Sequence, residues 1–166
     1  MGTHRLRGGV IDAERTTGPR HAVPRRMKPS QIRDYIGHQH IQLRILCVEV
    51  EHACRDCVDA RQTILKLVSS VEDHLHMEDV LLVPALRECD GWGEVRAERV
   101  SEEHRRQREQ LSALHRLAKH GSASDAARAA EELIAALLAD MDAEEKDLLS
   151  PNLLRDDLVV VDQSGG

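Results

Sequence analysis

Two segments of the chain carry the same apolar pattern, and each interrupts it at the same two places. Residues spaced three and four apart are expected to share one face of a helix. In the first segment this face reads Ile64, Leu67, Val71, His74, Glu78 and Leu82. In the second segment, displaced by 66 residues, it reads Ala130, Leu133, Leu137, Asp140, Glu144 and Leu148. Both segments are therefore predicted to be helices that direct a pair of polar side chains, four residues apart, at an apolar interior.

The composition favours helices around that interior. The chain has 166 residues, enough for one domain with a substantial core. It contains no Phe, one Tyr and one Trp, although 41% of its residues are hydrophobic. The core must therefore be built from Leu, Val, Ile and Ala, and we expect an all-α fold.

Breaks in the apolar pattern divide the chain into four helices. We expect them from about Ser30 to Cys54, Asp59 to Val83, Glu94 to Lys119, and Ser124 or Asp125 to Leu149. Pro84 is predicted to end the second helix, and Gly121 suits a cap for the third. Short connections between helices of similar length predict an antiparallel up-down four-helix bundle over residues 30–151.

The two ends of the chain look different from this central part. Residues 1–29 are rich in Arg and Gly without periodicity, so we expect a disordered basic tail, and residues 152–166 a loose C-terminal tail. No apolar run suits a secretory signal or a membrane span, which predicts a cytoplasmic protein without a membrane partner. The net charge of −6 argues against nucleic acid as the partner. The cysteines, including the Cys54-x-x-Cys57 pair, are interpreted as reduced thiols.

The polar residues on the apolar faces predict a metal site. A carboxylate in an apolar core costs several kcal/mol, roughly, unless it is protonated or paired with a cation. On the third helix, His104 lies on the stripe formed by Val100 and Leu111. On the first helix, His40 lies at the edge of the apolar arc and His38 on its polar side, so we choose His40 and keep His38 as the alternative.

Counting residues from each connection brings these positions to one level of an antiparallel bundle. Three imidazoles and three carboxylates on facing helices suit iron or manganese. The predicted metal ligands are His40, His74, Glu78, His104, Asp140 and Glu144. Glu78 and Glu144 are the expected bridging carboxylates, and Asp140 has the alternative role of a hydrogen-bond acceptor behind the ligands.

Four stretches of the sequence resemble the motifs of the hemerythrin-like (HHE cation-binding) domain family. They are "QHIQLRILC", "HLHMEDVLLVP", "EEHRRQREQL" and "DMDAEEKDLLSP", within roughly residues 31–151. The resemblance implies a four-helix bundle around a non-haem di-iron centre that binds O2, or responds to O2, nitric oxide, peroxide or iron. The fourth motif of that family begins with His, where this chain has Asp140. An aspartate ligand at this position would favour ferric iron. The resulting site would resemble the metal sites of carboxylate-rich di-iron enzymes.

The resemblance makes iron the expected cofactor, with manganese or zinc as alternatives, and a small oxidant the expected partner. Any catalysis would be redox chemistry at the metal. Two other interpretations stay open at this point. One is a metal-poor four-helix interaction or regulatory module with a buried polar network, and the other is a mononuclear structural metal site.

Overall fold

The structure is a computed structural model that describes residues 27–56 and 59–157. Within these residues all regular structure is helical, which confirms the predicted all-α class. The elements are α1 (Pro29–Arg55), α2 (Arg61–Met77), the π-helix η1 (Glu78–Leu82), α3 (Val83–Cys89), α4 (Gly93–His120) and α5 (Ala123–Asp147). Residues 1–26 and 158–166, most of the two predicted tails, lie outside the described residues, as does Cys57 of the Cys54-x-x-Cys57 pair.

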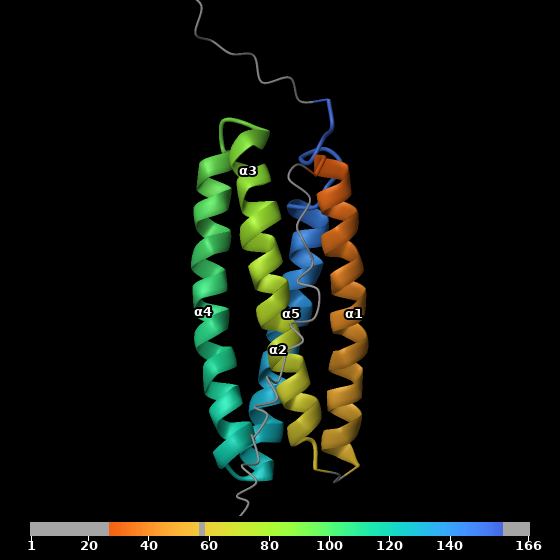
Figure 1. The fold of residues 1–166 in the computed structure, drawn as a ribbon, viewed down its shortest axis with the longest axis vertical. Coiled ribbons are helices and arrows are strands. Elements are labelled where there is room, and N and C mark those ends of the chain that lie inside the picture. Colours follow the sequence, from red (N-terminus) through yellow and green to blue (C-terminus); the bar gives the residue numbers. More distant parts are fainter. Residues whose placement is uncertain (1–26, 57–58, 158–166) are drawn as a thin grey trace, which may run out of the picture.

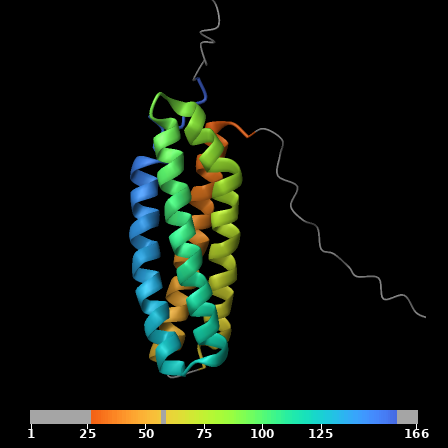
Figure 2. The same ribbon diagram turned by 90° about the vertical axis from the view of Figure 1, so that its left-hand side faces the viewer.

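The helices lie side by side along the long axis of the molecule, as a helical bundle does (Figure 1, Figure 2). The elements α2, η1 and α3 follow one another in a single rod, which packs against α1 on one side and α4 on the other. Helix α5 contacts both α1 and α4 and so completes the bundle. No described helix is both long enough and apolar enough to cross a membrane.

The predicted end of the second helix at Pro84 is wrong, because helical backbone continues to Cys89. Proline lacks the N–H of a regular helical turn, and its ring crowds the carbonyl four residues earlier. The preceding turn is widened in η1, where the N–H of Val83 bonds to the carbonyl of Glu78, five residues back. A π turn before the exposed Pro84 thus lets the rod continue where a regular α-helix would break.

Two helix starts also differ from the predicted ones. Helix α1 begins at Pro29 rather than Ser30, and the N–H of Lys28 donates to Gln31 Oε1 at 2.9 Å. Helix α5 is capped by Ser122, whose Oγ accepts from the N–H of Asp125 at 3.1 Å. Proline suits the first turn because the N–H it lacks has no helical partner there, and serine suits the cap because its oxygen reaches a free N–H.

Residues 152–157, predicted to be part of a loose tail, pack against α1. Leu154 is buried, and its carbonyl accepts from Arg33 Nη1 at 3.3 Å. The carboxylate of Asp156 accepts from the Ser30 N–H at 2.9 Å and from its hydroxyl at 2.7 Å. This end of the described chain therefore covers one end of the bundle core.

The apolar core is divided into two clusters. The larger cluster contains Leu43, Leu75, Leu111 and Met141, and the smaller contains Ile36, Leu82, Val100 and Leu149. On each rod the residues of the two clusters are separated by a buried polar residue: His40 on α1, Glu78 at the start of η1, His104 on α4 and Glu144 on α5. The bundle thus holds a polar layer between two apolar ones.

Candidate metal centre

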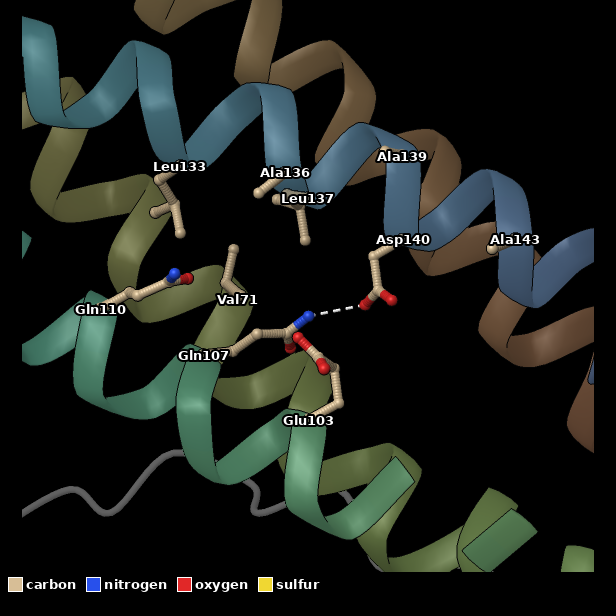
Figure 3. Close-up of a pocket in the computed structure, with 10 residues that line it drawn as sticks. All are labelled: Val71, Glu103, Gln107, Gln110, Leu133, Ala136, Leu137, Ala139, Asp140 and Ala143. Carbon is tan, nitrogen blue, oxygen red and sulfur yellow. Dashed lines mark hydrogen bonds between the residues drawn. The ribbon is translucent and has the colours of Figure 1, made fainter. Parts of the chain in front are cut away.

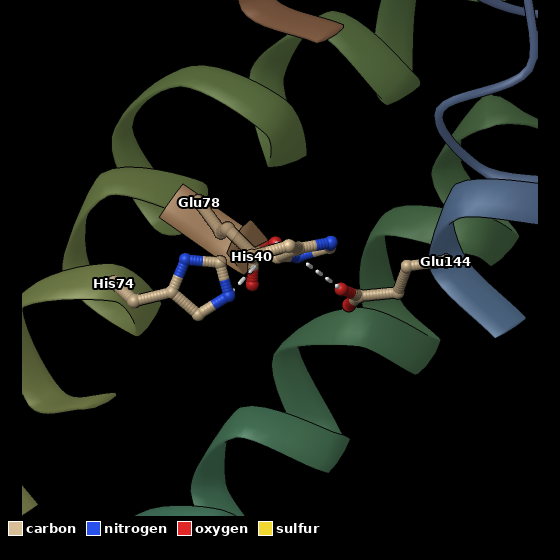
Figure 4. Close-up of side chains that lie close together, drawn as sticks. All are labelled: His40, His74, Glu78 and Glu144. Atoms are coloured by element: carbon tan, nitrogen blue, oxygen red, sulfur yellow. Dashed lines mark ion pairs between the residues drawn. The ribbon is translucent and has the colours of Figure 1, made fainter. Parts of the chain in front are cut away.

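Five of the six predicted ligands form this polar layer. The exposed fractions of His40, His74, Glu78, His104 and Glu144 range from 0% to 7%. In four of them, His40, His74, Glu78 and Glu144, one nitrogen or oxygen atom each lies within 4.8 Å of all the others (Figure 4). His38 is exposed, so the helix phase correctly separated it from His40.

Glu78 occupies the middle of the layer. Its Oε1 lies 3.8 Å from His40 Nε2 and 3.5 Å from His74 Nε2. Its Oε2 lies 3.1 Å from His104 Nε2. Glu144 approaches from the α5 side, with its Oε2 3.4 Å from His40 Nε2. The two oxygens of Glu78 therefore face different imidazoles, which is the arrangement that a bridging carboxylate needs.

The outer nitrogen of each imidazole contacts an acceptor on another rod. His40 Nδ1 lies 2.9 Å from Glu145 Oε1, His74 Nδ1 3.1 Å from Gln39 Oε1, and His104 Nδ1 2.7 Å from Asp79 Oδ1. Carboxylate and amide oxygens only accept hydrogen bonds, so each Nδ1 carries a proton. The tautomers are thereby fixed with Nε2 toward Glu78, as in metal sites where a histidine ligand donates its other N–H to a supporting acceptor.

Sequence reasoning missed these three acceptors, although each adjoins a predicted ligand in the chain. Glu145 follows Glu144, Asp79 follows Glu78, and Gln39 precedes His40. Three of the four rods, all except α4, thus present one residue to the layer and its chain neighbour to the back of an imidazole on another rod. The two carboxylates also bind arginines: Arg44 Nη1 donates to Glu145 at 2.6 Å, and Arg108 Nη2 donates to Asp79 Oδ2.

Three polar atoms of the layer are buried without a hydrogen-bond partner: His40 Nε2, His104 Nε2 and Glu78 Oε1. Leaving a buried polar atom unpaired costs about 1–3 kcal/mol. A cation between these atoms would accept their lone pairs and remove that cost. Imidazole nitrogens together with carboxylate oxygens suit iron, manganese or zinc, so the residues present fit a metal ion.

The pKa shifts of the residues in the layer show that its carboxylates favour positive charge beside them. Burial alone would lower the pKa of His40, but the carboxylates of Glu144, Glu78 and Glu145 raise it to about 9. Burial would raise the pKa of Glu78, yet the neighbouring imidazoles of His104 and His40 lower it. Burial raises the pKa of Glu144, and the nearby Glu78 adds to this. In the absence of a metal, protons therefore supply positive charge that a metal ion would replace.

The sixth predicted ligand, Asp140, is not brought into this group. It is half-buried, and its Oδ2 accepts from Gln107 Nε2 at 2.6 Å (Figure 3). Burial raises the pKa of Asp140, and the charges of Glu103 and Glu78 act in the same direction. The helix phase predicted that Asp140 faces the bundle interior. In the structure its side chain bonds to Gln107 of α4, beside the polar layer.

Comparison with known proteins agrees with this geometry. Curated proteins and solved structures gave no significant match. Residues 31–150, which include all the buried polar residues of the layer, match the hemerythrin HHE cation binding domain. The chain therefore belongs to the hemerythrin HHE cation-binding domain family.

Proposed function

We propose that the protein is a non-haem di-iron protein that binds, senses or scavenges O2, peroxide or nitric oxide, or handles iron. Membership of a cation-binding family supports metal binding, and the donor set of the polar layer suits iron. One observation carries the proposal. Three imidazoles have their Nδ1 atoms held by acceptors and turn their Nε2 atoms toward the same buried carboxylate, Glu78.

The proposed ligands are His40, His74, Glu78, His104 and Glu144. Glu78 is the proposed bridge because its two oxygens face different imidazoles, and Glu144 is the second carboxylate. Bound iron would supply one-electron redox chemistry and an open coordination position for a small oxidant. The protein's own residues fix the imidazole tautomers, and the apolar clusters cover the layer toward both ends of the bundle.

The antiparallel up-down order of the helices belongs to the same proposal. The course of the chain in Figure 1 and the contacts of α5 with both α1 and α4 support it. In this order the chain direction alternates from one rod to the next, and the polar residues of all four rods lie at one level of the bundle.

A mononuclear site is the second candidate, because four of the ligand atoms already lie within 4.8 Å of one another. His104, which approaches Glu78 from α4, decides between the two. In a di-iron centre it binds the second metal ion, so its loss should halve the metal content. In a mononuclear site, the loss of His104 should leave the metal content at one ion per chain.

Metal analysis after aerobic purification from iron-supplemented cells tests the proposal. Two irons per chain with near-ultraviolet charge-transfer bands would support a di-iron protein, one metal the mononuclear site, and none would refute metal binding. His74→Ala should lower the metal content. The matched control is His76→Ala, which changes an exposed histidine two residues away on the same helix and should leave the content unchanged.

A further inference from the structure

A hollow between α4 and α5 lies beside the metal centre. Its volume is about 330 Å³, and its walls include Glu103 and Gln107 on α4 and Asp140 on α5 (Figure 3). A second hollow of about 230 Å³ shares Glu103 and Asp140 with the first and reaches Glu144, a proposed ligand. Small side chains, Ala136, Ala139 and Ala143, leave the space open on the α5 side. The two hollows thus share part of their walls, and the second borders a residue of the polar layer.

The polar groups of the first hollow leave acceptor oxygens without a positive partner. The amide of Gln107 donates to Asp140, which fixes its orientation and leaves its Oε1 as the free end. Gln107 is only 7% exposed, and this Oε1 is buried without a hydrogen-bond partner. Asp140 adds a half-buried carboxylate. Glu103 adds another, one oxygen of which is paired with Arg106 Nη2 at 3.1 Å.

We propose that Glu103, Gln107 and Asp140 form a loading subsite that binds a divalent metal cation on its way to the metal centre. Two carboxylates and an amide oxygen are hard oxygen ligands. A cation bound between them would satisfy the unpaired Gln107 Oε1. Asp140 lies four residues, about 6 Å along the helix axis, from Glu144. A cation leaving Asp140 therefore meets Glu144 next, along the second hollow.

Acidic side chains outnumber basic ones around the second hollow, four to two. Arg96 and Arg99 line it on the α4 side, opposite Asp140, Glu144 and Asp147 on α5. Arg96 is engaged by Asp90, with Nη1 and Oδ1 2.6 Å apart. Few protein ligands and partial exposure suit weak, transient binding, whereas the buried layer suits tight binding. The inference rests on the proposed function, since it assumes that the layer takes up metal.

The rate of metal uptake tests the inference. Metal-free full-length protein is mixed with Co²⁺ in a stopped-flow instrument, and visible absorption follows the formation of the loaded centre. A variant combining Glu103→Gln and Asp140→Asn should load about tenfold or more slowly, the lower range of electrostatic effects on association. Its final cobalt content and spectrum should equal those of the wild type. Gln107→Met, which removes the acceptor oxygen together with the N–H that donates to Asp140, should slow loading in the same direction.

Glu109→Gln is the control for the loss of a carboxylate elsewhere on α4. Glu109 lies on the same helix, is exposed, and pairs with Arg105 away from the hollow, so this variant should load at the wild-type rate. Equal loading rates in the wild type and the double variant would overturn the inference and leave the proposed function intact. A changed final cobalt content or spectrum would also overturn it, because Asp140 or Glu103 would then be a ligand of the centre. A wild type that takes up no cobalt would overturn the proposed function itself.

Discussion

Replacing Glu145 should weaken metal binding although Glu145 is not a proposed ligand. Its Oε1 accepts from both His40 Nδ1, at 2.9 Å, and Arg44 Nη1, at 2.6 Å. Asp142 provides a natural control on the same helix. It accepts from Nη2 of the same arginine at 2.7 Å and, within the described part of the chain, contacts no imidazole of the layer. Glu145 and Asp142 thus both accept from Arg44, but only Glu145 also accepts from His40.

The structure sets the expected size of the effect. A hydrogen bond to a charged group contributes about 1.5–3 kcal/mol and a neutral one about 0.5–1.5 kcal/mol. Glu145→Gln should therefore cost about 1 kcal/mol, roughly fivefold in metal affinity. An amide can still hold an imidazole here, as Gln39 does for His74 at 3.1 Å. Glu145→Ala removes the acceptor and should cost about 10–100-fold in affinity, as losses of such supporting groups usually do.

Competition with a chromophoric chelator for Zn²⁺ or Co²⁺ at fixed pH measures these affinities. The expected order is wild type, then Glu145→Gln, then Glu145→Ala, with Asp142→Asn within about twofold of wild type. If Asp142→Asn weakened binding as much as Glu145→Ala, the cause would be the loss of negative charge near Arg44. The role of Glu145 in orienting His40 would then be refuted. An unchanged affinity of Glu145→Ala would refute it as well.

The raised pKa of His40, about 9 against 6.5, means that folded metal-free protein keeps a proton that the unfolded chain loses. Its contribution to stability is full below pH 6.5 and should fall by roughly 1–3 kcal/mol as pH rises to about 9. Denaturant titrations at the two pH values would show this, and a stability that rises instead would contradict it; with metal bound, the loss should shrink. A Cβ added at Gly93 would lie 2.1 Å from the Leu86 carbonyl oxygen, whereas Gly91 has no atom within 4 Å. Gly93→Ala should therefore lower the free energy of unfolding by about 1–3 kcal/mol or more, and Gly91→Ala by less than about 0.5 kcal/mol; similar losses in both would exclude the clash as the cause. Burial raises the pKa of the Cys47 thiol to about 11, and only 1% of the residue is exposed. Alkylation at pH 8, followed by mass spectrometry, should modify Cys47 about 100-fold more slowly in the folded protein than in urea, and equal rates would show that the site opens.

The sequence was sufficient to find the buried layer because helix periodicity fixes direction and residue counting fixes height. His74 and Glu78 interrupt an apolar stripe, so their burial follows from the residues around them. The choice of His40 over His38 followed from phase in the same way. These are local properties of single helices, and neighbouring helices do not change them.

Properties that depend on two helices at once were not accessible in this way. Asp140 has the phase of a ligand, but its short side chain meets Gln107 of α4, which no pattern within α5 reveals. The acceptors Glu145, Asp79 and Gln39 lie at positions that look like ordinary helix surface. Their role becomes visible only when the rotation of one helix against its neighbour is known. A rule that inspects the chain neighbours of each ligand would have found all three.

The π turn at η1 begins at Glu78, and its cause can be decided by comparison within the molecule. One explanation is that the widened turn lets consecutive carboxylates serve the centre, Glu78 toward the layer and Asp79 toward His104 Nδ1. Helix α5 does the same with Glu144 and Glu145 in regular α-helix. Consecutive carboxylates therefore reach both places without a π turn. What distinguishes the η1 segment is Pro84, two residues after its end, so the proline accounts for the irregular backbone. The paired carboxylates of the metal centre need only regular helix geometry.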